Sequence, residues 1–330
     1  MPELLIELLS EEIPARMQAK AADDLKRLVC KGLTDARLAF ESAEAFVTPR
    51  RLALVVEGLP VQQPDEKKER KGPRVGAPEK AIEGFLKSAG LKSVDQCEVR
   101  EINGAEYYFV VSEKKGRSTG GAIVDILPRI VWSFPWPKSM RWPEGQGRYV
   151  RPLHNILLIF NGVPLNFMAG VRTAGGSGIP VNNITRGHRF LAPDSFEVRD
   201  FADYKKKLKA AKVILDPAER RAVIEKQAKQ KATRAKLAVR DDPALLDEVT
   251  GLVEWPVVLM GRIEDQFMDL PPEVLTTSMR AHQKYLALID ESGALANRFL
   301  VVANMAIALP RSAGAARAPG GCAVFLGPGP

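Results

Sequence analysis

Residues 248–285, EVTGLVEWPVVLMGRIEDQFMDLPPEVLTTSMRAHQKY, constrain the fold of this chain more than any other stretch. The apolar run 257–260 follows Trp255-Pro256 and is typical of a short buried strand. The Pro271-Pro272 pair then interrupts the chain, and the pattern after it predicts a helix over residues 273–285. The apolar face of this helix would hold Val274, Leu275 and Met279. The stretch therefore predicts a packed sheet that presents a polar, cationic helix.

Short strands and helices alternate along the rest of the chain. The patterns predict strands at residues 3–9, 40–46, 51–56, 97–102, 107–111, 153–160, 286–290 and 299–303, and helices at 15–36, 78–89, 122–134 and 241–249. Ser10 is expected to cap the first helix, with Glu11 and Glu12 in its first turn. Asn103-Gly104 predicts a hairpin turn. The fold class expected is α+β: several small mixed or antiparallel sheets covered by helices, in a multidomain chain with a basic helical segment.

The positions of proline-rich, glycine-rich and charged stretches predict the domain organisation of the chain. Residues 1–62 form an N-terminal α+β module, and 63–78 form a linker because residues 62–78 are polar and interrupted by prolines. Residues 79–190 form a mixed α+β module with a Gly-rich loop at 174–183, which lacks the Lys-Ser/Thr of a phosphate-binding P-loop. Residues 191–304 combine a basic helical insertion with a sheet and helix module, and 305–330 form a disordered or out-of-frame tail.

Charge points to an anionic partner. The formal net charge is +8 with a pI near 9.3, and residues 205–240 hold 13 Lys or Arg but only three acids. The pattern there predicts two helices separated at Asp216-Pro217, with Asp216 as the cap. A charged helix is often only a solvated face, yet this excess of cations is larger than solubility requires. The candidates for polyanion contact in this segment are Lys205, Lys206, Lys207, Lys209, Arg220 and Arg221.

Further cations occur in short motifs. Residues 136–142 interleave Trp136 and Trp142 with cations, which suits base stacking and phosphate pairing, although the tryptophans could equally anchor a core. Residues 185–190 place two arginines around a histidine, a pattern that fits either phosphate contact or a local salt-bridge cluster. The additional RNA-contact candidates are Arg50, Arg51, Lys138, Arg141, Arg151, Arg186, His188, Arg189, His282 and Lys284.

A family resemblance rests on unusual residues that recur in order. These are the segments LLIELLSEEIPA, TPRRLAL, PKSMRW, VRPLH and TRGHRFLAP, followed by Trp255, Pro256, Pro271, Pro272, His282 and Tyr285. Over roughly residues 2–304, the sequence resembles the N-terminal portion of the beta subunit of bacterial heterotetrameric glycyl-tRNA synthetase. The resemblance implies a subunit of a glycine-tRNA ligase that binds tRNA-Gly and completes an alpha2-beta2 tetramer with the alpha subunit. It further implies that ATP, with Mg, is used through the alpha subunit, which holds the adenylation site.

The residues themselves offer no catalytic or metal constellation. Glu11-Glu12 and Asp23-Asp24 are adjacent carboxylates, and neighbours on a helix do not face each other. Cys30, Cys97 and Cys322 lie far apart, which argues against a disulfide framework or a zinc site. No cofactor bound by this chain and no membrane contact are expected. The composition, 45% hydrophobic and 27% charged, fits a soluble globular protein, and a cytoplasmic location is expected.

The resemblance ends near Met305. The remaining sequence, with its PRSAGAARAPGG composition, is expected to be either a disordered tail or the product of a frameshift in a truncated beta subunit. Two alternatives to the synthetase-subunit hypothesis remain. One is a non-catalytic, general RNA-binding protein, and the other is an inactive truncated product.

Overall fold

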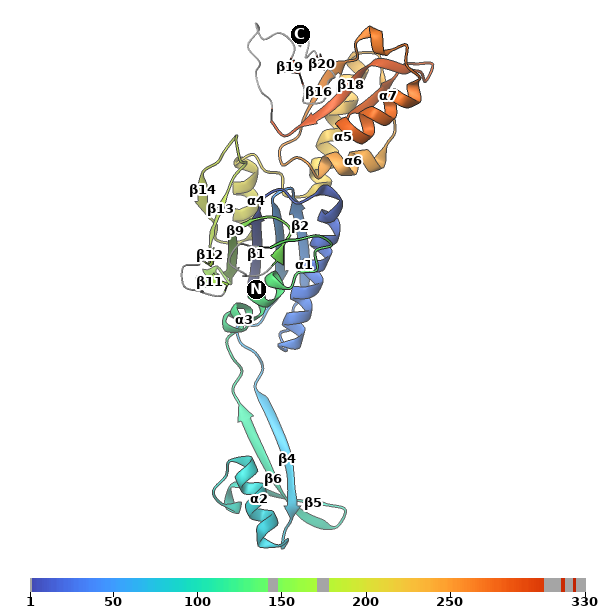
Figure 1. Ribbon diagram of the computed structural model, residues 1–330. Coiled ribbons are helices and arrows are strands. Elements are labelled where there is room, and N and C mark those ends of the chain that lie inside the picture. Colours follow the sequence, from blue (N-terminus) through green and yellow to red (C-terminus); the bar gives the residue numbers. More distant parts are fainter. Residues whose placement is uncertain (1, 142–147, 171–177, 306–315, 318–322, 325–330) are drawn as a thin grey trace.

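The computed structural model describes residues 2–141, 148–170, 178–305, 316–317 and 323–324. Figure 1 shows three parts: a central domain built on the largest sheet, an arm at one end, and a C-terminal domain at the other. The arm comprises residues 63–116, the C-terminal domain residues 216–305, and the central domain the described residues before and between them. The predicted α+β class is confirmed.

The central sheet has the strand order β11-β12-β9-β1-β3-β2, with β10 paired to β9. All neighbours are antiparallel except β12 and β9, which are parallel. The strands are β1 (Glu3–Ser10), β2 (Ser42–Thr48), β3 (Arg51–Glu57), β9 (Leu153–Phe160), β10 (Val163–Pro164), β11 (Phe167–Ala169) and β12 (Ile179–Asn182). The predicted modules 1–62 and 79–190 therefore share one sheet.

Strand β1 is central because it is apolar on both faces. Leu4, Ile6 and Leu8 face the main core with helices α1 (Ala15–Asp35) and α3 (Thr119–Trp132). Leu5 faces a second core that contains residues of α4 (Phe201–Ala210). Burial on two faces produces the continuous apolar run from which the strand was predicted.

The prediction that Ser10 caps the first helix was wrong. Ser10 is the last residue of β1, where its backbone N–H donates to the carbonyl of Arg50 at 2.8 Å. Helix α1 begins at Ala15, after Pro14, and has no side-chain cap. Glu11 and Glu12 consequently lie in the connection between strand and helix, not in the first helical turn.

The arm consists of the sheet β4-β6-β5 with one helix. Its elements are β4 (Glu66–Arg74), α2 (Glu79–Ala89), a 3-10 turn (Val94–Gln96), β5 (Glu98–Ile102) and β6 (Ala105–Lys114). The hairpin at Asn103-Gly104 is confirmed, with φ of 50° and 75°. The predicted linker, by contrast, contains β4, paired with β6.

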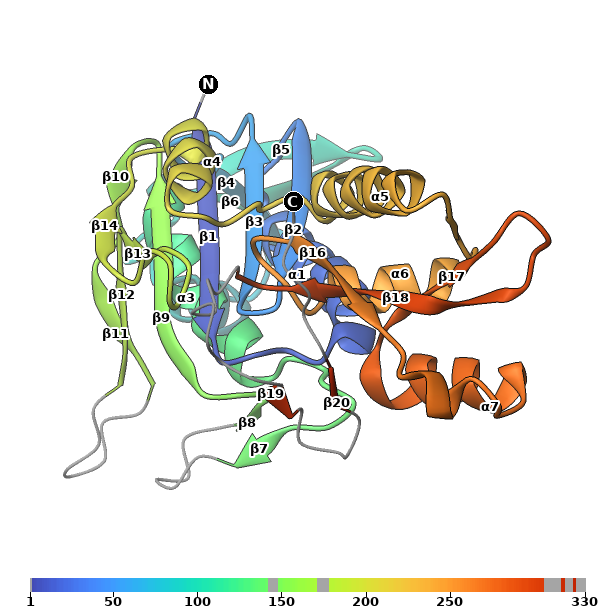
Figure 2. The ribbon, with the colours of Figure 1, turned by 90° about the horizontal axis from the view of Figure 1, so that it is seen from above.

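The C-terminal domain packs two helices against the sheet β15-β17-β18-β16 and lies beside the central sheet (Figure 2). Its elements are α5 (Pro217–Arg234), β15 (Ala238–Val239), α6 (Pro243–Thr250), β16 (Val257–Arg262), a 3-10 turn (Asp265–Phe267), α7 (Pro272–Ser278), β17 (Leu286–Ile289) and β18 (Leu295–Ala303). The helix predicted over 273–285 continues past α7 only as one π-helical turn, Met279–Gln283. Val274 is 54% exposed, so its assignment to a buried face was wrong.

The remaining described strands are short. They are β7 (Met140–Arg141), β8 (Arg148–Tyr149), β13 (Ile184–Arg186), β14 (Ser195–Glu197), β19 (Ala316–Arg317) and β20 (Ala323–Val324). Of the predicted Gly-rich loop, residues 174–177 lie outside the described residues, and residues 179–182 form β12. Trp142 and most of the predicted tail also lie outside them. None of the helices described is long and apolar enough to cross a membrane.

Candidate nucleic-acid interface

The two predicted basic helices, α4 and α5, both form. Asp216 caps α5, its carboxylate accepting from the backbone N–H of Ala218 at 2.8 Å, and Pro217 occupies the first turn. Tyr204 and Leu208 of α4 are fully buried. The lysines between them, Lys205 and Lys206, are exposed on the outer side of the helix.

Several cations of these helices are already paired with carboxylates. Lys207 Nζ lies 2.8 Å from Asp203, and Lys209 Nζ lies 2.7 Å from Glu219. Arg221 pairs with Glu225 at 3.1 Å and also with Asp247. Lys205 and Lys206, by contrast, have no ion-pair or hydrogen-bond partner within the described part of the chain. These two are the uncompensated cations of α4.

Arg51 is buried and cannot make the surface contact that was predicted for it. Its guanidinium lies between two buried carboxylates, 3.2 Å from Glu7 and in contact with Glu254. Burial alone would lower the pKa of Arg51, but the charges of Glu254 and Glu7 raise it above its ordinary value. Because Glu254 belongs to the C-terminal domain, this cluster joins that domain to the central sheet.

The pKa values of the two carboxylates are shifted in opposite directions. Burial would raise the pKa of Glu254, but Arg51 and a hydrogen bond from the hydroxyl of Thr48 at 2.7 Å hold it below its ordinary value. Burial raises the pKa of Glu7, although Arg51 and a hydrogen bond from Tyr204 oppose this shift.

Arg220 and His188 are also fully buried. Arg220 donates to the carbonyls of Ile214, Leu215 and Val47 at 2.8–2.9 Å, and burial lowers its pKa to about 10. His188 Nδ1 accepts the backbone N–H of Leu191 at 3.1 Å. These buried side chains therefore stabilise the fold. Because they are buried, Arg51, Arg220 and His188 are not available as the RNA contacts for which they were selected.

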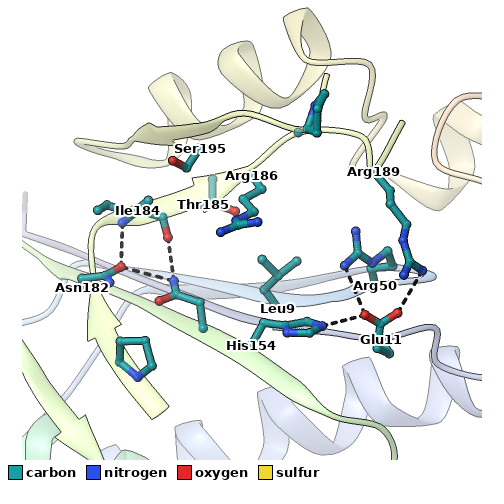
Figure 3. Close-up of a pocket in the computed structure, with 14 residues that line it drawn as sticks. Leu9, Glu11, Arg50, His154, Asn182, Ile184, Thr185, Arg186, Arg189 and Ser195 are labelled. Atoms are coloured by element: carbon teal, nitrogen blue, oxygen red, sulfur yellow. Dashed lines mark hydrogen bonds and ion pairs between the residues drawn. The ribbon is translucent and has the colours of Figure 1, made fainter. Parts of the chain in front are cut away.

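A pocket of about 570 Å³ brings together Arg50, Arg186 and Arg189 (Figure 3). Arg50 comes from the turn between β2 and β3, Arg186 from the end of β13, and Arg189 from the loop after it. His154 of β9, which the sequence analysis did not select, also lines this pocket. His154 belongs to the VRPLH motif, but nothing in the sequence around it indicated that it pairs with Glu11.

Glu11 organises one side of this pocket. Its carboxylate lies 2.7 Å from His154 Nε2, 3.0 Å from Arg189 Nη1 and 3.8 Å from Arg50 Nη2. Burial would raise the pKa of Glu11, but the hydrogen bond from His154 and the nearby arginines lower it. Arg189 Nη1 also contacts Glu12 at 2.8 Å, so the two adjacent carboxylates converge on one cation. The expectation that they do not face each other was wrong, because they are not on a helix.

The opposite side of the pocket carries Arg186. Its side chain is exposed and has no hydrogen-bond or ion-pair partner within residues 2–141, 148–170 and 178–305. Beside it, the Asn155 side chain donates to the carbonyl of Ile184 at 2.6 Å, and Asn182 accepts the N–H of Ile184 at 2.8 Å. These contacts fix the start of β13, which carries Arg186 (Figure 3).

The other predicted contacts are scattered. Lys138 and His282 are exposed, and Lys284, in the left-handed conformation at φ 56°, pairs with Glu248 at 3.0 Å. The Arg151 guanidinium donates to the carbonyl of Val150 at 2.9 Å. The Arg141 side chain lies outside what the structure describes.

The aromatic part of segment 136–142 is partly a core anchor. The ring of Trp136 lies 4.7 Å from that of Phe134 and 5.1 Å from that of Tyr149. The described residues contain no group of three or more His, Cys, Asp or Glu placed to hold a metal ion. Cations and hydrogen-bond donors dominate the candidate site, which suits binding of an anion.

Comparison with known proteins identifies similar chains. Residues 4–313 match the family model of the glycyl-tRNA synthetase beta subunit. The glycine–tRNA ligase beta subunit of Rhodospirillum centenum is 51% identical over 321 residues, covering 92% of this chain and 45% of the relative. The corresponding subunit of Paracoccus denitrificans is 50% identical, covering 92% of this chain and 44% of the relative. The chain thus spans less than half the length of these curated relatives.

Proposed function

The chain belongs to the family of glycyl-tRNA synthetase beta subunits, and from this premise we propose that it binds tRNA-Gly as part of a glycine-tRNA ligase. In this proposal the chain assembles with an alpha subunit in an alpha2-beta2 tetramer in the cytoplasm. The alpha subunit uses ATP with Mg to form the adenylate, and the present chain supplies RNA contacts.

The observation that carries the proposal is the outward-facing, unpaired charge of α4. Lys205 and Lys206 project from a helix whose other face is buried by Tyr204 and Leu208. Cations without an intramolecular carboxylate are free to neutralise phosphates, which releases condensed counterions from the nucleic acid. Paired cations such as Lys209 must first give up an existing partner.

Reversal of this charge tests the proposal. The double substitution Lys205→Glu/Lys206→Glu is expected to weaken binding of a tRNA-Gly transcript by roughly tenfold or more, because it replaces two attractions with two repulsions. The matched control is Lys80→Glu/Lys87→Glu on α2, where both lysines are exposed on the distant arm. Both variants change the net charge equally, so an equal loss of affinity in both would remove α4 as the contact surface.

A further inference from the structure

We propose that the pocket around Arg50 and Arg186 is a binding site for a phosphate group of a nucleotide, with Arg186 as the principal ligand. The charged residues that line the pocket are three arginines and one glutamate. Arginine presents a planar set of donors that matches the oxygens of a phosphate. The volume of the pocket, about 570 Å³, lies within the range of small-molecule pockets.

The cationic side chains of the pocket differ in how closely they are paired with a carboxylate. Glu11 holds His154 and Arg189 at hydrogen-bonding distance, so these two groups form the wall of the pocket. The guanidinium of Arg50 lies farther from the same carboxylate, at 3.8 Å. Arg186 receives no compensating charge from any described residue. An anion that enters the pocket would therefore meet Arg186 first and Arg50 second.

Arg50 provides a second, independent observation. Its side chain is only 13% exposed, and its Nε is buried without a hydrogen-bond partner among the described residues. A poorly paired and largely buried guanidinium is costly, and an anion in the pocket would give Arg50 a second charge partner beside Glu11, which lies 3.8 Å from its Nη2. The guanidinium lines the same cavity as that of Arg186 (Figure 3).

The backbone that carries Arg186 is held in place by the domain core. The buried Arg51 donates to the carbonyls of Arg186 and Gly187 at 2.5 and 3.2 Å. The neighbouring Thr185 hydroxyl donates to Glu7 at 2.5 Å. A binding site whose ligand-bearing strand is fixed by buried contacts loses little freedom when it binds. Because these anchors use main-chain and neighbouring groups, the Arg186 side chain can be replaced without disturbing them.

Two sources could supply the phosphate, the RNA backbone or a free nucleotide. Binding of a phosphate group in this pocket does not depend on RNA binding. Only the identification of that phosphate as part of an RNA rests on the function proposed above. The test therefore measures both ligands. AMP and inorganic phosphate are titrated with the full chain and followed by ³¹P NMR, and tRNA-Gly binding is measured in parallel. Acetate at the same ionic strength is the control anion.

Arg186→Met is expected to weaken binding of AMP and inorganic phosphate roughly tenfold or more, since a charge-assisted hydrogen bond is removed. Arg186→Lys keeps the charge but not the fork, so its affinity should lie between those of the wild type and Arg186→Met. Arg27→Met is the matched control: Arg27 is an exposed arginine on α1, 60% accessible and paired with Asp24. Arg27→Met should bind AMP and inorganic phosphate as tightly as the wild type does. Thermal unfolding of each variant verifies that the fold is intact.

The outcomes separate the two proposals. Loss of AMP binding together with loss of tRNA affinity in Arg186→Met supports a phosphate of RNA, and loss of AMP binding alone supports a free nucleotide. Failure of the wild type to bind tRNA would remove the proposed function but leave the pocket testable with AMP. Phosphate and AMP affinities that are unaffected by Arg186→Met, or equal to that of acetate, would overturn the phosphate site.

Discussion

Arg220 and Arg221 are neighbours in the sequence with opposite roles. Arg220 is fully buried and donates to main-chain carbonyls of the central domain, including that of Val47, and to the carbonyl of Thr250 in the C-terminal domain at 3.4 Å. Arg221 is one-third exposed and pairs with Glu225 and Asp247. Arg220→Met should lower the free energy of unfolding by at least about 3 kcal/mol, because several buried acceptors lose their donor. Arg221→Met should cost less than about 1 kcal/mol.

Urea unfolding followed by circular dichroism measures both values. Arg221→Met is the control, since it replaces the same residue type on the same helix. Comparable losses of stability in the two variants would contradict a structural role specific to Arg220.

Glu254 links the stability of the domain junction to pH. Its pKa is held below the ordinary value of 4.5, so its contribution to stability is fully present above that value. The contribution is lost as the pH falls from about 4.5 through the lower folded-state pKa. Glu254→Gln is expected to cost about 3–5 kcal/mol at pH 7, because Arg51 loses one of its two buried carboxylate partners.

The difference in stability between wild type and Glu254→Gln should therefore shrink between pH 5 and pH 3, which chemical denaturation at a series of pH values measures. Asp265→Asn is the control, because Asp265 pairs with Arg262 on the surface. A difference that stays constant over this range would show that the charge of Glu254 does not stabilise the junction.

The sequence shows that Arg51 and Arg220 are charged, but it does not show that they are buried. Arg51 and Arg220 were grouped with surface cations because the sequence does not show their distant contacts: Arg51 pairs with Glu254, and one of the acceptors of Arg220 is the carbonyl of Val47, each more than 170 residues away. Local patterns report local partners only. Lys205 and Lys206 were selected by the same criterion of charge, and they are exposed because Tyr204 and Leu208 of the same helix face the core.

Among the secondary-structure elements, those with at least one buried face could be predicted. Strand β1 has the continuous apolar run of a strand that is buried on both faces. Helices α1 and α5 have apolar residues at helical spacing that pack against a core. Strand β4 has little of this signal, because much of its sequence is charged and its described side chains are largely exposed. It forms because β6 supplies a ladder partner from Glu66↔Lys114 to Arg74↔Tyr107.

The arm should be an independent element. It has buried apolar side chains of its own, Phe85, Phe109 and Val110, and it joins the central domain where Gln63 N–H donates to the carbonyl of Arg117 at 2.9 Å. Replacing residues 66–114 with Asn-Gly would close the stem as a two-residue hairpin. The free energy of unfolding of the remaining protein should change by less than about 1 kcal/mol.

Thermal and urea unfolding of the shortened protein, compared with the full chain, measure this change. Gly104→Ala in the full chain is the companion variant, because Gly104 has φ of 75° at the tip of the arm and alanine there is strained. Aggregation or loss of cooperative unfolding after removal of the arm would mean that the central domain depends on it.

At the scale of the whole molecule, the pocket shows why a site is harder to predict than a fold. Glu11, Arg50, His154 and Arg186 come from four separate segments that meet at one end of the central sheet. The sequence motifs contained all four residues, and Arg50 and Arg186 were selected by charge. Their convergence depends on the antiparallel pairing of β9 with β1, in which Ser10 lies opposite Leu153.

The concentration of charge on α4 and α5 predicts how tRNA binding responds to salt. Each phosphate neutralised contributes roughly −0.7 to −0.9 to the slope of log affinity against log salt concentration. The wild-type slope should be steep, and Lys205→Glu/Lys206→Glu should reduce its magnitude by about 1.4–1.8, because two phosphates are no longer neutralised. Filter binding of labelled tRNA-Gly and a non-cognate tRNA over a salt series measures both slopes. Because phosphate contacts carry no sequence information, this reduction should be equal for the two tRNAs. A preference for tRNA-Gly that survives in the variant would assign discrimination to base contacts made elsewhere on this chain, whereas equal affinity of the wild type for both tRNAs would support general RNA binding by this chain.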